Sequence, residues 1–148
     1  MQVTIYFGNM AKANSKSEPP AVESLRCPVA STLELMGDRW TLVVVRDLFL
    51  GKHRYSEFQD SPEGIPTNIL AERLKRLEAL EIVEKTAYQP HPIRYDYTLT
   101  PKGRELLPVV RALREWGLKH VPNTGIPEKY RSLIPASAKP VHKISPKP

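Results

Sequence analysis

The spacing of hydrophobic residues along this 148-residue chain changes from a helical period to an alternating one and back. In the first helical stretch, Val29, Leu33 and Met36 share one face, and Gly37 follows as a residue that tolerates positive φ at a helix end. A second helix is predicted over residues 39–50, capped by Asp38 and ended by Gly51. Its expected buried residues recur at helical spacing: Trp40, Val43, Val44 and Leu48.

A short helix over Tyr55–Gln59 and a turn over residues 61–64 precede the most amphipathic segment, predicted as a helix over residues 66–80. One face of that helix carries only leucines, Leu70, Leu74, Leu77 and Leu80. The other face is polar and consists of Thr67, Asn68, Glu72, Arg73, Lys75 and Arg76.

The alternating pattern then predicts two strands, Glu81–Tyr88 and Arg94–Leu99. Two prolines between them cannot donate to a ladder, so residues 89–93 are expected at the tip of a hairpin. A last helix is predicted from Pro101, capped by Thr100, to about His120. Pro108 inside it is expected to kink the helix or to join two segments.

This order predicts an α+β, mostly α fold: a winged helix-turn-helix with a three-helix core, a β-hairpin wing and an added C-terminal dimerisation helix. The organised part is expected over residues 26–120, where DNA binding and dimerisation would lie. Residues 1–25 are interpreted as a weakly ordered arm, and residues 121–148, with six of the fifteen prolines, as an extended basic tail.

Composition excludes several classes of protein. No apolar run reaches the roughly 20 residues of a membrane helix, and the first residues do not resemble a secretory signal. The single cysteine cannot form an internal disulfide, which fits a cytoplasmic protein, and it makes a structural zinc site improbable. No phosphate-binding glycine loop, GxSxG or HExxH motif is present, so we expect no catalytic residues, no metal and no cofactor.

The positive charge is unevenly distributed. The net charge is +6, and residues 100–148 carry 10 basic and 3 acidic groups, whereas residues 66–99 carry 5 of each. A basic tail raises affinity for polyanions without specificity. Any base contacts from the amphipathic helix must therefore be few and set by geometry.

Ordered blocks of residues between positions 27 and 117 resemble HxlR-type transcription regulators, relatives of the MarR group. The blocks are Cys27-Pro28-Val29, Met36-Gly37-Asp38-Arg39-Trp40-Thr41, Arg46-Asp47-Leu48, Gly64-Ile65-Pro66-Thr67-Asn68-Ile69-Leu70, Arg73-Leu74-Lys75-Arg76-Leu77-Glu78, Tyr95-Asp96-Tyr97-Thr98-Leu99-Thr100-Pro101-Lys102-Gly103-Arg104 and Trp116-Gly117. Many members have Ser or Ala where this chain has Pro66. The resemblance implies a homodimer that binds a pseudo-palindromic operator on double-stranded DNA and acts as repressor or activator.

The docking of helix-turn-helix proteins favours the N-terminal, solvent-facing side of helix 66–80 as the part that contacts base edges. Expected contacts are Asn68 with adenine, Arg73 or Arg76 with guanine or phosphate, and Thr67 beside them. Glu72 would accept from cytosine or hold Arg76 at i, i+4. The alternative interpretation is a solvated helix face whose charges pair with one another.

Phosphate contacts are expected from Arg54, Tyr55 and Ser56 at the start of the short helix, where backbone N–H groups point outward. At the hairpin tip, His91 and Arg94 are candidates for the minor groove or its flanking phosphates. His91 is equally interpreted as a solvated tip residue.

Cys27 lies just before the first helix, where the helix dipole stabilises a thiolate. The family resemblance implies a redox-sensing candidate, since some members sense oxidants or electrophiles through a cysteine in the corresponding position. The alternative is a small buried apolar residue.

An apolar stripe on the last helix exceeds what the small core requires and predicts a dimer contact shared with the first helix. Its residues are Leu33, Leu35, Leu106, Val109, Val110, Leu113 and Trp116; packing within one subunit is the alternative. The effector stays open between an oxidant, an apolar ligand and none. The alternative function is a winged-helix module for protein or RNA contact with a non-specific basic tail.

Overall fold

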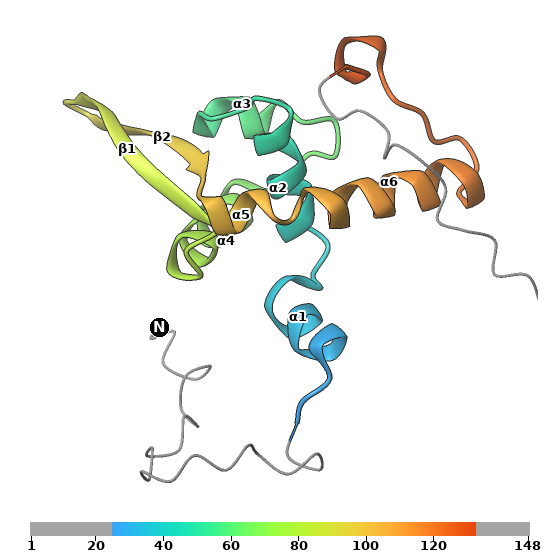
Figure 1. The fold of residues 1–148 in the computed structure, drawn as a ribbon. Helices are drawn as coiled ribbons and strands as arrows, with labels where there is room; N and C mark the ends of the chain where they lie inside the picture. Colours follow the sequence, from blue (N-terminus) through green and yellow to red (C-terminus); the bar gives the residue numbers. More distant parts are fainter. Residues whose placement is uncertain (1–24, 133–148) are drawn as a thin grey trace, which may run out of the picture.

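The computed structural model describes residues 25–132 and confirms the predicted winged helix-turn-helix fold (Figure 1). The elements are α1 (Pro28–Met36), α2 (Thr41–Phe49), α3 (Tyr55–Gln59), α4 (Thr67–Ala79), β1 (Val83–Pro90), β2 (Ile93–Leu99), α5 (Pro101–Arg104), α6 (Leu107–His120) and a 3-10 helix, Glu128–Tyr130. Most of the arm expected over residues 1–25 and of the tail expected over residues 121–148 lies outside the described residues, since residues 1–24 and 133–148 are not described.

The core is formed where α2, α4 and the base of the hairpin meet, and α6 crosses α2 (Figure 1). Leu70, Leu74 and Leu77 of α4 are almost completely buried, as the leucine spacing predicts, and Leu80 is half-buried. A fully buried leucine contributes about 2 kcal/mol relative to an exposed one. The leucine face therefore fixes α4 on the core and leaves its polar face outward.

Helix α2 begins two residues later than predicted. The Asp38 carboxylate accepts the backbone amides of Trp40 at 2.9 Å and Thr41 at 3.1 Å, so it caps the turn that leads into the helix. Val44 and Val45 are buried, whereas Val43 is only half-buried because it lines a hollow shared with α6.

The two helix-ending glycines differ. Gly51 follows the end of α2, as the sequence predicts, and has φ 88°, a left-handed conformation that glycine adopts readily. Gly37 ends α1 as predicted, but its φ is −82°, so it does not use the positive φ that glycine tolerates. What constrains Gly37 is space, since a Cβ would lie 2.4 Å from the Leu33 carbonyl oxygen.

The hairpin pairs β1 with β2 in antiparallel register from Val83↔Leu99 to Pro90↔Ile93, with an irregularity between Ala87 and Gln89. Its tip is shorter than predicted and consists of His91 and Pro92. Proline has no backbone N–H to donate. Pro90 is tolerated because β1 is an edge strand of a two-stranded sheet, where no further strand needs a donor at this position.

The predicted discontinuity at Pro108 is a join between two helices, with Pro108 in the first turn of α6. Thr100 caps α5 with its side chain. Its backbone N–H also donates to the Ile82 carbonyl at the base of the hairpin, at 3.1 Å. Gly103 packs against the same carbonyl, where a Cβ would lie only 2.1 Å from the oxygen. Close backbone contact therefore joins α5 to the wing.

Helix α1 stands apart from the other helices (Figure 1). Met36 is its only buried residue, and Val29 and Leu33 on the same helix are exposed. At the other end, the segment after α6 is not simply extended. Thr124 donates to the carbonyls of Gly117 and Val121, and the following residues bring the 3-10 helix back beside α2.

Candidate nucleic-acid interface

The outward face of α4 carries the residues suited to touch bases. Thr67, Asn68, Glu72 and Lys75 are exposed and lie opposite the buried leucines. Lys75 makes no ion pair with any other residue between 25 and 132. It lies on the same face of α4 as Asn68, as the helical spacing of the polar residues predicts, and it adds a further candidate for a base contact.

Helix α3 holds the first turn of α4. The Tyr55 hydroxyl donates to the Thr67 carbonyl at 2.6 Å, and the Gln59 amide donates to the Thr67 hydroxyl at 3.1 Å. Pro66 occupies the N-cap position of α4 and offers no side-chain cap. Tyr55 and Gln59 therefore hold the first turn of α4 through Thr67, although this turn has no side-chain cap. Gln59 was not predicted, because its role depends on a contact between two helices.

Arg54 joins α3 to the wing. Its Nε donates to Asp96 at 3.3 Å, its guanidinium lies 4.5 Å from the centre of the Tyr88 ring, and its backbone forms a β-bridge with Asp96. A hollow of about 440 Å³ separates α3 from the hairpin, and its lining includes Arg54, Ser56 and Arg94. The structure thus brings three of the predicted phosphate-contacting residues together.

The short helix is fixed by an acidic cap. Glu57 accepts the backbone amides of His53 at 2.8 Å and Arg54 at 2.9 Å. These two amides hold the pKa of the Glu57 carboxyl below its usual range, against the opposing effect of burial. Glu57 therefore stays ionised and keeps the start of α3 in place.

At the wing, His91 and Arg94 are both exposed, His91 in the two-residue tip and Arg94 in β2. The Gln89 amide donates to the His91 carbonyl at 3.2 Å. Lys85 on β1 is paired with Glu78 at 3.2 Å. Arg94 makes no ion pair with another described residue and so is a cation of the wing that an external anion can approach.

Two residues that the sequence predicts as DNA contacts, Arg73 and Arg76, form hydrogen bonds within the protein instead. The Arg73 Nε donates to Asp38 at 2.8 Å, and its side chain is 14% exposed. Arg76 donates to the Glu34 carbonyl of α1 at 2.8 Å. Glu72 pairs with Arg73 at 2.9 Å, not with Arg76. Arg73 and Arg76 therefore join α4 to the α1–α2 region, and this engagement separates them from the outward face.

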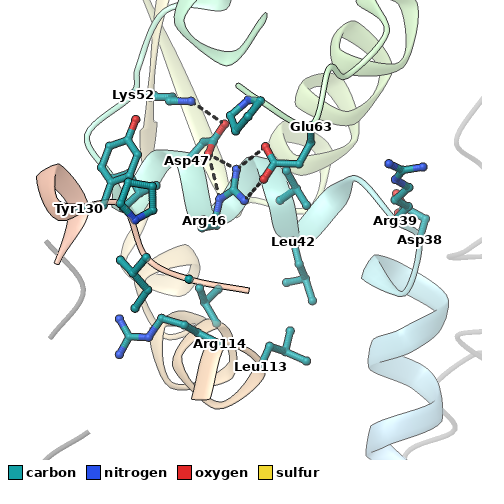
Figure 2. A pocket seen from close by; sticks show the side chains of 17 residues that line it. Asp38, Arg39, Leu42, Arg46, Asp47, Lys52, Glu63, Leu113, Arg114 and Tyr130 are labelled. Atoms are coloured by element: carbon teal, nitrogen blue, oxygen red, sulfur yellow. Dashed lines mark hydrogen bonds and ion pairs between the residues drawn. The ribbon is translucent and has the colours of Figure 1, made fainter. Parts of the chain in front are cut away.

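A buried ion cluster supports the turn between α3 and α4. Asp47 is 2% exposed; Arg46 and Lys52 donate to it, as does Ser61 from the turn. Arg46 also donates to both carboxylate oxygens of Glu63, at 2.6 and 3.0 Å (Figure 2). Lys52 is thus engaged inside the protein by Asp47 and Ser61.

The hydrogen bonds from Arg46 hold the pKa of the Glu63 carboxyl below its usual range, and burial opposes this effect. Arg46 and Glu63 therefore form a persistent ion pair between α2 and the α3–α4 turn.

The predicted dimer surface divides into exposed and internal residues. Leu33 is 57% and Trp116 is 61% exposed, and Val109 and Leu113 are also exposed. Val110 instead belongs to the core of its own chain, because it is 6% exposed and faces α2. Leu35 and Leu106 are half-buried. The exposed apolar surface further includes Leu25, Val29, Leu118 and Val121.

Cys27 is exposed and occupies the N-cap position of α1, with Pro28 at the first helical position. The alternative interpretation, that Cys27 is a small buried residue, is wrong for the single chain because the thiol is exposed there. Within residues 25–132, no three His, Cys, Asp or Glu side chains gather as metal ligands, and no helix is long and apolar enough to cross a membrane.

A recognition helix, its supporting helix and a two-stranded wing define a winged helix-turn-helix protein. The chain belongs to the HxlR-like helix-turn-helix family, whose profile matches residues 35–124. An uncharacterized HTH-type transcriptional regulator of Synechocystis is 32% identical over 111 residues, which are 75% of this chain and 82% of that protein. The HTH-type transcriptional regulator YodB of Bacillus subtilis is 37% identical over 91 residues, 61% of this chain and 81% of that protein.

Two solved structures extend the comparison. The redox regulator HypR in its reduced form matches with a TM-score of 0.60 and 33% identity, over 65% of this chain and 95% of that chain. The reduced form of YodB matches with a TM-score of 0.54 and 33% identity, over 68% of this chain and 100% of that chain. The family and these relatives are transcription regulators and not enzymes, so the chain is a helix-turn-helix transcriptional regulator.

Proposed function

We propose that the protein is a homodimeric, sequence-specific DNA-binding regulator that inserts α4 into the major groove. The observation that carries this proposal is the outward face of α4, with Asn68 and Lys75 exposed and the first turn held by Tyr55. Asn68 has the bidentate amide that pairs with adenine, and a rigid first turn is what a base contact requires.

The wing and α3 would hold the duplex on either side of α4. Arg54, Ser56 and Arg94 surround one hollow and supply donors for phosphate oxygens, which position a protein on DNA without specifying sequence. His91 extends at the tip toward the flanking groove. Thr67 and Glu72 complete the candidate set on α4, while Arg73 and Arg76 act as supports.

A dimer is supported by the exposed apolar residues of α1 and α6. Leu33, Leu113 and Trp116 are each more than half exposed in the single chain, which is unfavourable in water. A second copy would bury them and would set two α4 helices against two half-sites about one helical turn apart. The operator is therefore expected to be pseudo-palindromic.

The test is a binding titration with the DNA upstream of the protein's own gene and with a scrambled duplex. Asn68→Ala/Lys75→Ala should lose selectivity for the upstream DNA, because each good base contact contributes about 1–3 kcal/mol. Lys129→Ala removes one equal charge outside the interface and should bind as the wild type does. Equal binding of both duplexes by the wild type would contradict the proposal.

The alternative, a non-specific module driven by its basic tail, gives a different result. A chain ending at Ser132 would then lose most of its affinity for any duplex, and the wild type would bind all duplexes equally and release them in salt. A specific regulator keeps its preference for one duplex after the truncation.

A response to oxidants through Cys27 is a second candidate, favoured by the exposed thiol beside the apolar surface of α1. Two structural relatives are described as the redox regulator HypR in its oxidized form and as diamide-treated YodB.

A further inference from the structure

Glu72 places a negative charge on the outward face of α4. It lies four residues after Asn68 and three residues before Lys75, and its side chain is 63% exposed. A carboxylate on a surface that approaches DNA is repelled by the phosphates. An acidic residue is therefore unfavourable at this position unless it meets a hydrogen-bond donor inside the groove.

The Glu72 carboxylate is held by the residue that follows it. Arg73 Nη1 donates to Glu72 Oε1 at 2.9 Å, and Nε of the same guanidinium donates to Asp38 at 2.8 Å. The Arg73 side chain is only 14% exposed, and Asp38 belongs to the turn between α1 and α2. These bonds fix an exposed acceptor to the body of the protein. They also reduce the side-chain entropy that a base contact would otherwise cost.

The second oxygen of this carboxylate stays available. Between residues 25 and 132, no donor is bonded to Glu72 Oε2. Lys75 does not pair with Glu72, although its spacing of i, i+3 would allow such a pair. The outward face of α4 therefore presents an oriented acceptor and a separate cation, and each can meet a different base.

The major groove offers few donors to an acceptor of this kind. Cytosine presents its N4 amino group and adenine its N6 amino group, whereas guanine and thymine present only acceptors and the thymine methyl group. An ionised carboxylate can only accept, so guanine and thymine repel it. Adenine has the N7 acceptor beside its amino group, which also opposes a carboxylate. Cytosine is therefore the base that fits best.

We propose that Glu72 selects cytosine at one position of each operator half-site and that Arg73 is the positioning residue that holds it there. This inference rests on the proposed insertion of α4 into the major groove. Glu72 would act largely by rejection, because the carboxylate disfavours the wrong bases more than it attracts the right one. The inward direction of Arg73 then contributes to sequence recognition, although Arg73 itself touches no base.

The test is selection of bound duplexes by the full chain from a pool of randomised sequence, followed by sequencing. In the wild type, one position of each half-site should be restricted to cytosine, with about tenfold weaker binding when guanine or thymine replaces it. Glu72→Gln should change this preference from cytosine to adenine, because a Gln amide accepts from N6 and donates to N7. The preferences at the other positions should stay the same.

Two further variants separate selection from charge. Glu72→Ala should lose the preference for cytosine and bind a scrambled duplex about threefold more tightly, because the phosphates no longer meet a negative charge there. The matched control is Glu128→Gln, which removes an equal charge from an 81% exposed side chain in the segment after α6. It should keep the base preferences of the wild type.

The positioning role of Arg73 is measured as a ratio of affinities for two duplexes that differ at one base pair. Arg73→Gln should reduce the preference for cytosine severalfold and leave the preference at the position contacted by Asn68 unchanged. In the Glu72→Ala background it should have no further effect on either ratio, because Arg73 acts through Glu72. A purely structural role would lower the preferences at both positions.

Unchanged base preferences in Glu72→Gln, together with selective binding, would overturn the role of Glu72 and leave the proposed function standing. An equal loss of preference at all positions in Arg73→Gln would overturn the positioning role. A wild type without any base preference would contradict the proposed function itself, and the role of Glu72 with it.

Discussion

Arg73 Nε lies 2.8 Å from Asp38 Oδ1 and so ties the recognition helix to the turn between α1 and α2. The same carboxylate accepts the amides of Trp40 and Thr41 and the hydroxyl of Thr41. Burial raises the pKa of Asp38, but these hydrogen bonds outweigh it and hold the pKa well below the usual range. Asp38 is therefore ionised at neutral pH and fixes two elements at once.

Asp38→Ala should lower the free energy of unfolding by about 2 kcal/mol, because it removes a helix cap and leaves the guanidinium of Arg73 with Glu72 as its remaining ion-pair partner. Chemical denaturation monitored by Trp fluorescence measures this loss. Asp60→Ala, at an exposed carboxylate, is the matched control and should change stability by less than about 0.5 kcal/mol. Similar losses in both variants would disprove the role of Asp38.

The pH dependence of stability follows from the lowered pKa of Asp38. Its contribution is fully present above the unfolded-state pKa of about 3.9 and is lost as the pH falls through the lower folded-state value. The stability difference between wild type and Asp38→Ala should therefore be constant from about pH 5 to 7 and shrink below about pH 4. A difference that grows on acidification would contradict this assignment.

Tyr55→Phe should weaken operator binding severalfold and cost about 1 kcal/mol of stability, since the Tyr55 hydroxyl donates to the Thr67 carbonyl. The matched control is Tyr88→Phe, because the ring of Tyr88, which stays in the variant, is what contacts Arg54. Operator affinity and denaturation are measured for both. If Tyr88→Phe impairs binding as much as Tyr55→Phe does, the support of α4 by α3 is not the cause.

The two glycines of the C-terminal helices should respond in opposite ways to alanine. At Gly103 a Cβ would lie 2.1 Å from the Ile82 carbonyl oxygen, so the backbone must shift, at a cost of about 2–3 kcal/mol. At Gly117, inside α6, nothing lies within 4 Å of the added atom. Gly117→Ala should stabilise α6 by about 0.5–1 kcal/mol. Thermal unfolding of the two variants distinguishes these effects.

Diamide should convert the protein into a disulfide-linked pair of chains, because the sequence has a single cysteine and the Cys27 thiol is exposed. Non-reducing electrophoresis detects the pair, and a DNA titration shows whether operator affinity changes with it. Cys27→Ser should remain a single chain under the same treatment. A diamide effect on DNA binding that persists in Cys27→Ser would exclude this cysteine as the sensor.

The helices and strands were largely predictable, because their burial follows spacing along the chain. The leucines of α4 are an example: Leu70, Leu74 and Leu77 are buried as their period requires. The join before Pro108 was also confirmed, since a proline in a first helical turn has a local cause. The reason for glycine at position 37 was not predictable from local preference, because the space beside the Leu33 carbonyl decides it.

The candidate site was less predictable, since it depends on contacts between distant residues. Arg73 and Lys75 are both cations on the polar side of α4. Arg73 is held inside the protein by Asp38, 35 residues earlier in the chain, whereas Lys75 stays exposed, and the sequence does not show this difference. Val110 belongs to the same apolar stripe of the sequence as the exposed Val109 and Leu113, yet it is buried because α2 packs against it. The hollow beside Tyr130 depends on a turn inside the proline-containing segment after α6, and that segment has no helical period from which a contact with α2 could be predicted.

Helix α1 has nine residues and buries only Met36 against its own chain. A helix of this length does not persist alone in water. If a second copy covers α1, the order of this segment depends on how much protein is present, and the apparent stability rises with concentration. A chain made in small amounts would keep α1 open to proteases and be removed before it could pair. The cell would then contain either almost none of this regulator or enough of it to act.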